Sequence, residues 1–182
     1  MPEDDLVIRT AVESDIDEIA DIIDEFAKGH ASENWKRQKS SLKQAYFNGA
    51  PIAHLYIAER NSIILGMGQW MREYDMFWAQ FGGVLEWLYV KPEYRGSGVA
   101  AAIVAELCSQ IRKSGGTYAK GEGLNPDVSK LYERVAIGWT ARKCSIAGEA
   151  FQVFADLSGL PLRQIVKGLP KQELNYTLPN KR

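Results

Sequence analysis

Residues 83–102 limit the possible folds of this chain more than any other stretch, because their pattern changes from strand to helix. Residues 84–90 are rich in β-branched and aromatic side chains, whereas a helical spacing of apolar residues begins near Ser97. The loop between them contains Gly96 and Gly98, so backbone N–H groups at a helix start face no large side chain. Such a helix start, where amides and the helix dipole point the same way, is typical of an anion-binding site.

Two common phosphate-binding motifs fit this loop poorly. A P-loop requires Lys and then Ser or Thr after its last glycine, and the residue after Gly98 is a valine. Residues 96–101 match the dinucleotide-binding pattern G-x-G-x-x-A, but residues 91–95 separate them from the strand. That fold also requires an almost wholly apolar strand, and Glu86 interrupts it. The dinucleotide interpretation therefore stays open but is weak.

A third pattern, R-x-x-G-x-A, is formed by Arg95, Gly98 and Ala100 after a strand that ends in Leu-Tyr-Val. Strand, loop and helix together resemble the GNAT family of acyl-CoA N-acyltransferases, and the resemblance covers about residues 6–157. It implies acetyl-CoA as the acyl donor, with its pyrophosphate on the loop amides and its pantetheine arm along the strand. The acetyl-CoA-binding residues implied in this way are Leu88, Tyr89, Val90, Arg95, Gly96, Ser97, Gly98, Val99, Ala100 and Asn125.

Glu86 is the candidate base. Strand alternation predicts that it shares a face with Val84, Leu88 and Val90, where a carboxylate is costly unless it lies at the rim or is used. The resemblance implies a role for this residue, since some members of that family with a similar strand use the Glu to bind or deprotonate the acceptor amine, often through water. A solvent-facing Glu at the edge of a strand is the alternative.

Tyr132 is the candidate proton donor. Asn125 and Pro126 form a helix start, and Tyr132 follows Asn125 by seven residues, which is two helical turns. The resemblance implies that its hydroxyl protonates the leaving sulfur. Without the resemblance, a core aromatic residue would be the simpler interpretation. In either role it belongs to a helix that follows the strand 117–121.

The acceptor is predicted to be a small primary amine. Residues 72–80 are aromatic and charged without a clear period, and they directly precede the strand of Glu86. A small satellite cluster is the alternative to a pocket wall. The candidate substrate-binding residues are Trp35, Trp70, Tyr74 and Trp78.

The order of predicted elements indicates a single-domain, GNAT-like α+β fold. We expect a mixed, mostly antiparallel sheet of six to seven strands with about four helices. Residues 54–60 and 62–70 form an antiparallel hairpin, and the helix 97–114 leads into a parallel crossover. The acyltransferase domain is predicted at 1–157, and 158–182 form an extension with a short helix and a loose tail.

Composition excludes several other classes of function. The 182 residues are 46% apolar and carry a net charge of −1, which gives no basic field for nucleic acid. Cys108 and Cys144 are far apart and have no metal-ligand spacing, so we expect no metal and direct transfer without an acyl-enzyme. No apolar run is long enough for a membrane span, which predicts a cytoplasmic protein. An acyl-CoA-binding module without turnover remains an alternative, and the sequence is compatible with a homodimer without requiring one.

Overall fold

The computed structural model describes residues 6–28, 39–77 and 79–121, together with residues 164, 167 and 168. The chain forms two compact units, of which the larger comprises residues 1–25 and 36–138 and contains the whole described sheet. In the smaller unit, residues 164, 167 and 168 are helical, and the short helix predicted after residue 158 stays a prediction. The predicted domain boundary at residue 157 lies outside the described residues.

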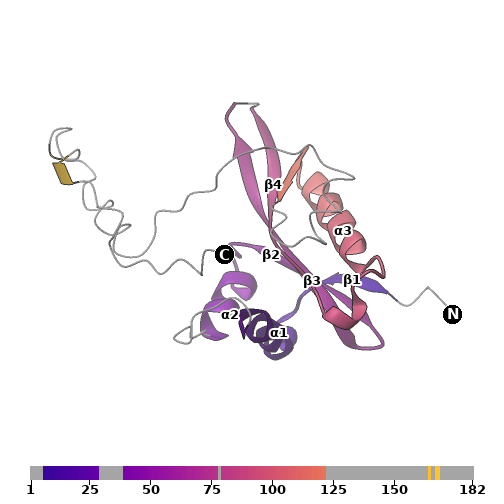
Figure 1. Ribbon diagram of the computed structural model, residues 1–182. Helices are drawn as coiled ribbons and strands as arrows, with labels where there is room; N and C mark the ends of the chain where they lie inside the picture. Colours follow the sequence, from indigo (N-terminus) through magenta and orange to yellow (C-terminus); the bar gives the residue numbers. More distant parts are fainter. Residues whose placement is uncertain (1–5, 29–38, 78, 122–163, 165–166, 169–182) are drawn as a thin grey trace. The chain divides into compact units, whose positions relative to one another are not determined.

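The described elements follow one another in the order β-α-α-β-β-β-α-β (Figure 1). They are β1 Val7–Thr10, α1 Ile16–Lys28, α2 Lys39–Phe47, β2 His54–Arg60, β3 Ile63–Asp75, β4 Gln80–Val90, α3 Val99–Lys113 and β5 Ala119–Gly121. Short 3-10 turns at Glu13–Asp15 and Pro92–Tyr94 precede α1 and follow β4. None of the helices in these described ranges is both long and apolar enough to cross a bilayer.

The five described strands lie in sequence order in one sheet. The pairs β1–β2, β2–β3 and β3–β4 are antiparallel, and β4–β5 is parallel. The predicted α+β class, the mixed sheet and the parallel crossover through α3 are therefore confirmed. The further helix and strands predicted beyond residue 121 lie outside the described residues.

The β2–β3 hairpin turns at Asn61 and Ser62, whose φ angles of 51° and 62° are those of a tight turn that matches strand twist. The hairpin is thus confirmed, but β3 continues to Asp75, five residues beyond its predicted end at Trp70. Residues 72–77, 79 and 80, expected to be part of an irregular connection, lie at the far end of a second hairpin between β3 and β4. Tyr74 in this segment pairs with Phe81 on the opposite strand.

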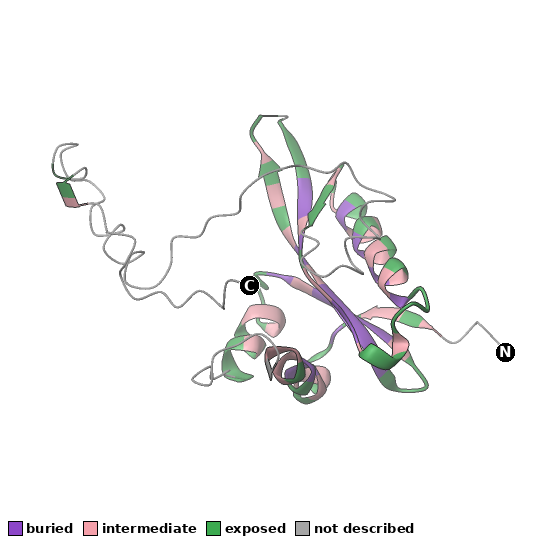
Figure 2. Cartoon of the chain, viewed as in Figure 1, coloured by how far each residue is buried: buried purple, intermediate pink, exposed green. Residues whose placement is uncertain are grey.

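The main core lies between α3 and one face of the sheet (Figure 2). Four side chains of α3 are at most 2% exposed: Val99, Ile103, Leu107 and Ile111. On β3, a Cβ atom added to Gly68 would lie 2.5 Å from Ile103 Cγ2, so only glycine allows α3 to approach this closely. The regular apolar spacing of α3 is therefore explained by its packing on small strand residues.

On the opposite face of the sheet, the helices α1 and α2 make other kinds of contact than α3 does. Helix α1 buries Ile19, Ala20 and Ile22, whereas α2 has no buried residue. Charged and polar contacts connect this side, including Lys91 Nζ to Glu18 Oε1 at 3.4 Å. Both faces of the sheet therefore bury apolar side chains, and the α1 side adds charged contacts.

Candidate functional site

A β-bulge interrupts β4 at Glu86. Gln69 of β3 pairs with Trp87, and the next residue, Trp70, pairs with Leu85, so Glu86 is the additional residue of the bulge. Its side chain is exposed. A bulge re-aims a side chain and changes the alternation of the strand, which places a carboxylate at the surface within an otherwise half-buried strand.

Because of the bulge, the residues around Glu86 do not share a face of β4 as predicted. Leu88 pairs with Gly68 and Leu85 with Trp70, and these two β3 residues lie on the face toward α3. Val84 therefore points to the opposite face from Leu88, although the two are four residues apart. Period-two alternation predicted that Val84, Glu86 and Leu88 share a face. This was wrong, because the additional residue of the bulge shifts the alternation of side chains by one position.

At the end of β4, the backbone edge is more available to a ligand than the side chains are. Tyr89 and Val90 are 7% and 8% exposed, and Leu88 is half-buried against the α3 core. Within the described residues, β5 pairs only with positions 83–85 of β4. The edge of residues 86–90 on the β5 side thus has no strand partner in the part of the chain that the structure describes.

The loop after β4 is braced by Arg95. Its Nε donates a hydrogen bond to the carbonyl of Val90 at 3.1 Å, and its guanidinium lies 5.8 Å from the centre of the Tyr89 ring. Ser97 Oγ donates to the carbonyl of Tyr94 at 2.5 Å. The side chains of Arg95 and Ser97 therefore hold the loop in place through hydrogen bonds to its own backbone. Burial raises the pKa of Tyr89.

Helix α3 begins at this loop without a side-chain cap. Its N-cap is Gly98, which has a φ angle of 89°, and Gly96 has a φ angle of 73°. A Cβ added to either glycine would meet no atom within 4 Å. The first-turn N–H groups of a helix have no acceptor inside the helix. The loop thus combines open space, uncapped amides and the positive end of α3, which suits a phosphate group.

The structure separates the predicted aromatic residues. Trp70 is 4% exposed and faces the α3 core, with its ring stacked on His54 at 4.6 Å. Tyr74 is 49% exposed and packs on Phe81, whose ring centre is 4.8 Å away. Phe81 precedes Glu86 by five strand residues, which is about 17 Å. The described aromatic candidates therefore do not gather at Glu86.

Four predicted site residues lie outside the described residues: Trp35, Trp78, Asn125 and Tyr132. Their roles stay predictions from the sequence. By contrast, Glu86 and the acetyl-CoA-binding candidates from Leu88 to Ala100 form one continuous strand end, loop and helix start.

Sequence reasoning missed a polar contact beside the bulge. Tyr46 of α2 donates a hydrogen bond from its hydroxyl to Gln69 Oε1 at 2.5 Å. Burial raises the pKa of Tyr46. Tyr46 is half-buried, and its partner is 23 residues away on a later strand. No local pattern in the sequence signals that pairing.

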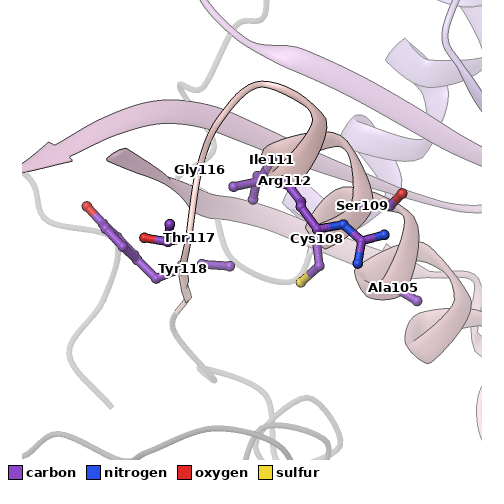
Figure 3. A pocket seen from close by; sticks show the side chains of 9 residues that line it. Ala105, Cys108, Ser109, Ile111, Arg112, Gly116, Thr117 and Tyr118 are labelled. Carbon is purple, nitrogen blue, oxygen red and sulfur yellow. The ribbon is translucent and has the colours of Figure 1, made fainter. Parts of the chain in front are cut away.

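A cavity of about 590 Å³ lies beside the second half of α3. Figure 3 shows Cys108 and Arg112 reaching it from the helix, with Thr117 and Tyr118 on the segment before β5. Burial raises the pKa of the Cys108 thiol, which disfavours the nucleophilic thiolate. Cys108 follows Gly98 by ten helical residues, about 15 Å. This cavity is therefore separate from the glycine loop.

Comparison with known proteins identifies the family. The sequence matches the acetyltransferase (GNAT) family over residues 16–136. Two relatives are thialysine N-epsilon-acetyltransferases, from Bos taurus at 30% identity and from Sus scrofa at 31%. Each alignment runs over 124 residues and covers 59% of this chain and 72% of the relative.

Solved structures share the fold. A ribosomal-protein-alanine N-acetyltransferase from Brucella melitensis biovar Abortus 2308 matches with a TM-score of 0.64 and 18% identity, over 79% of this chain and 99% of that one. An aminoglycoside acetyltransferase from an uncultured soil metagenomic sample matches with a TM-score of 0.62 and 13% identity, over 81% and 97% of the two chains.

The family match decides among the interpretations of the glycine loop. It covers β4, the loop and α3 in one alignment, which sets aside the dinucleotide-binding alternative. The N-acetyltransferase relatives likewise set aside a binding module without turnover. The chain belongs to the GNAT acetyltransferase family and is an acyltransferase.

Proposed function

We propose that this acyltransferase moves an acetyl group from acetyl-CoA to the primary amine of a small molecule, by direct attack in a ternary complex. The observation that carries the proposal is the continuous arrangement of the β4 bulge, the glycine loop and the uncapped start of α3. It offers a carboxylate on β4 and an anion-binding loop that follows the end of the same strand. An amine-to-thioester transfer requires both.

The donor side consists of main-chain groups. Acetyl-CoA supplies an activated thioester. The amides of the Gly96–Gly98 loop and the first turn of α3 would hold its pyrophosphate, since nothing within 4 Å of either glycine blocks the approach. The N–H groups near Leu88 would hold the thioester oxygen, and those near Val90 the pantetheine arm. Arg95 keeps this loop attached to the end of β4.

The acceptor side centres on Glu86. An exposed carboxylate at a bulge attracts an ammonium group and can take its proton, directly or through water. The nitrogen must be neutral to attack. The relatives named for the ε-nitrogen of thialysine support an amine on a small molecule as acceptor.

Tyr132 would protonate the departing sulfur, and Asn125 would contact acetyl-CoA. Both assignments rest on the family pattern around Leu131-Tyr132-Glu133 in the sequence. Replacing Tyr132 by Phe keeps the ring and removes the proton, so kcat should fall about ten-fold to ten-thousand-fold with little change in KM for acetyl-CoA. An unchanged kcat across the pH range would place Tyr132 in the core instead.

The proposal is tested by acetyl-CoA binding followed by thiol release over a panel of amines. Acetyl-CoA should raise the melting temperature, since it binds only the folded protein, and NADH should not. Gly98→Val should abolish this shift because it places a β-branched side chain at the approach to the loop amides. Gly115→Val is the matched control, since Gly115 follows the other end of α3 with a φ angle of 88° and the same open space.

Both variants carry similar backbone strain, so a difference between them reports ligand binding rather than folding. Loss of the acetyl-CoA shift in both, or in neither, would contradict the loop assignment. A shift with acetyl-CoA but no thiol release with any amine would contradict the proposed reaction.

A further inference from the structure

The contact between Tyr46 and Gln69 adds a residue to the acceptor side of the site. Gln69 is the β3 residue paired with Trp87, immediately beside the bulge at Glu86. Paired Cα atoms in an antiparallel ladder lie about 5 Å apart, so Gln69 and the bulge are neighbours. The α2 residue Tyr46 therefore reaches the sheet next to the proposed base.

The direction of the hydrogen bond follows from the chemistry of the two atoms. Gln69 Oε1 is a carbonyl oxygen that can only accept, so the Tyr46 hydroxyl donates its single proton to it at 2.5 Å. The phenol oxygen then retains lone pairs and no proton to give. It is thus prepared to accept a hydrogen bond from an N–H donor, such as an ammonium group.

The surroundings suit a cation as well. Gln69, Trp87 and Tyr89 lie on the sheet face away from α3, and the rings of Trp87 and Tyr89 are 6.4 Å apart. Tyr46 is half-buried, and burial raises its pKa, so the phenol stays protonated and keeps its bond to Gln69 throughout the neutral range. Aromatic rings and a fixed phenol oxygen therefore lie on this face of the sheet, next in register to the bulge that contains Glu86.

We propose that Tyr46, oriented by Gln69, is a specificity-determining residue that accepts a hydrogen bond from the acceptor amine on the α2 side of the β4 bulge. The inference rests on the proposed N-acetyltransferase function and extends it. Tyr46 selects acceptors that bring an N–H donor to this position, while Glu86 receives the proton of the attacking nitrogen. Gln69 acts as a positioning residue, through Tyr46.

The test compares Tyr46→Phe with wild type on the best amine found in the panel. Loss of one hydrogen bond to a charged partner should lower kcat/KM for the amine about 10-fold to 100-fold, mainly through KM. The KM for acetyl-CoA should stay within about twofold, since the donor side is untouched. Tyr118→Phe is the matched control, because it removes the same hydroxyl at the separate cavity beside α3 and should change neither KM.

A double-mutant cycle separates positioning from direct contact. Gln69→Ala should raise KM for the amine less than Tyr46→Phe does, and the double variant should be no worse than Tyr46→Phe alone. Gln69→Glu keeps an acceptor for the Tyr46 proton and should retain a KM near that of wild type or lower. Additive losses in the double variant would overturn the positioning role of Gln69.

The outcomes distinguish this inference from the proposed function. If wild type acetylates amines and Tyr46→Phe has an unchanged KM for every amine, the role of Tyr46 is refuted while the function stands. Equal rises in KM for the amine and for acetyl-CoA would indicate a merely structural role and also refute it. If wild type transfers acetyl to no amine, the function itself fails.

Discussion

Helices α3 and α2 are attached to the rest of the protein by opposite kinds of interaction. Helix α3 has four side chains that are at most 2% exposed, packed on glycines of β3 and β4. Helix α2 has no buried residue and is attached by ion pairs to α1 and to the 3-10 turn before it, and by the Tyr46 hydroxyl to Gln69 of β3. Helix α3 therefore contributes far more apolar burial than α2, so residues of α2 are available for contact with a ligand.

This division predicts unequal responses to the same substitution. Leu107→Ala removes a fully buried side chain of α3 and should lower the free energy of unfolding by about 2–5 kcal/mol. Leu42→Ala on the half-buried side of α2 should cost less than about 1.5 kcal/mol. Urea denaturation monitored by tryptophan fluorescence measures both. Equal losses would show that α2 contributes as much to the core as α3.

The bulge should show the reverse pattern, with a large effect on turnover and a small one on stability. Glu86→Gln should lower kcat/KM for the amine about 100-fold or more if the carboxylate takes the proton. Since Glu86 is exposed, the free energy of unfolding should change by less than about 0.5 kcal/mol. Raising the pH should partly restore turnover as neutral amine replaces ammonium.

The matched control is Glu106→Gln, a half-buried carboxylate on α3 that accepts a hydrogen bond from Gln110. We expect wild-type turnover for this variant. Full activity of Glu86→Gln at neutral pH would remove Glu86 from the mechanism and leave its bulge as a structural feature only.

Charges on the α1 side also predict an effect of pH. Asp15 accepts hydrogen bonds from Arg9, at 2.7 Å and 2.9 Å, and from the amide of Val12, at 2.8 Å. The hydrogen bond with Arg9 is the main reason that the pKa of Asp15 is lowered. A carboxyl with a lowered folded-state pKa stabilises fully above its unfolded pKa of about 3.9, and this contribution is lost as pH falls through the folded value.

Asp15→Asn should therefore lower the free energy of unfolding at pH 7 by about 1–2 kcal/mol. Below a pH of about 4, the free energy of unfolding of the variant should decrease less steeply with falling pH than that of wild type. Thermal melts from pH 3 to 7 measure this. In wild type, hydrogen exchange should show acid loosening in α1 and α2 before α3. An unchanged acid limb in the variant would mean that other carboxylates control acid unfolding.

The sequence predicted those parts of the molecule that follow from local pattern. The β2–β3 hairpin, the α3 stripe and the glycine loop depend on neighbours within a few residues, and each appears where it was expected. The bulge at Glu86 could not be predicted, because it is defined by the register of another strand. The Tyr46–Gln69 contact and the core position of Trp70 depend on tertiary packing in the same way.

The smallest effect is expected at the exposed ion pair that joins α2 to the 3-10 turn before α1. Lys43 pairs with Glu13, and their side chains are 60% and 56% exposed, so solvent and salt screen the attraction. Lys43→Gln should lower the melting temperature by less than about 3 °C, and 0.5 M salt should remove most of that difference. The KM for the amine should not change, because the Tyr46 hydroxyl still connects α2 to Gln69 beside the bulge. A large rise in that KM would mean that the charged contacts, rather than the phenol, position α2 over the acceptor.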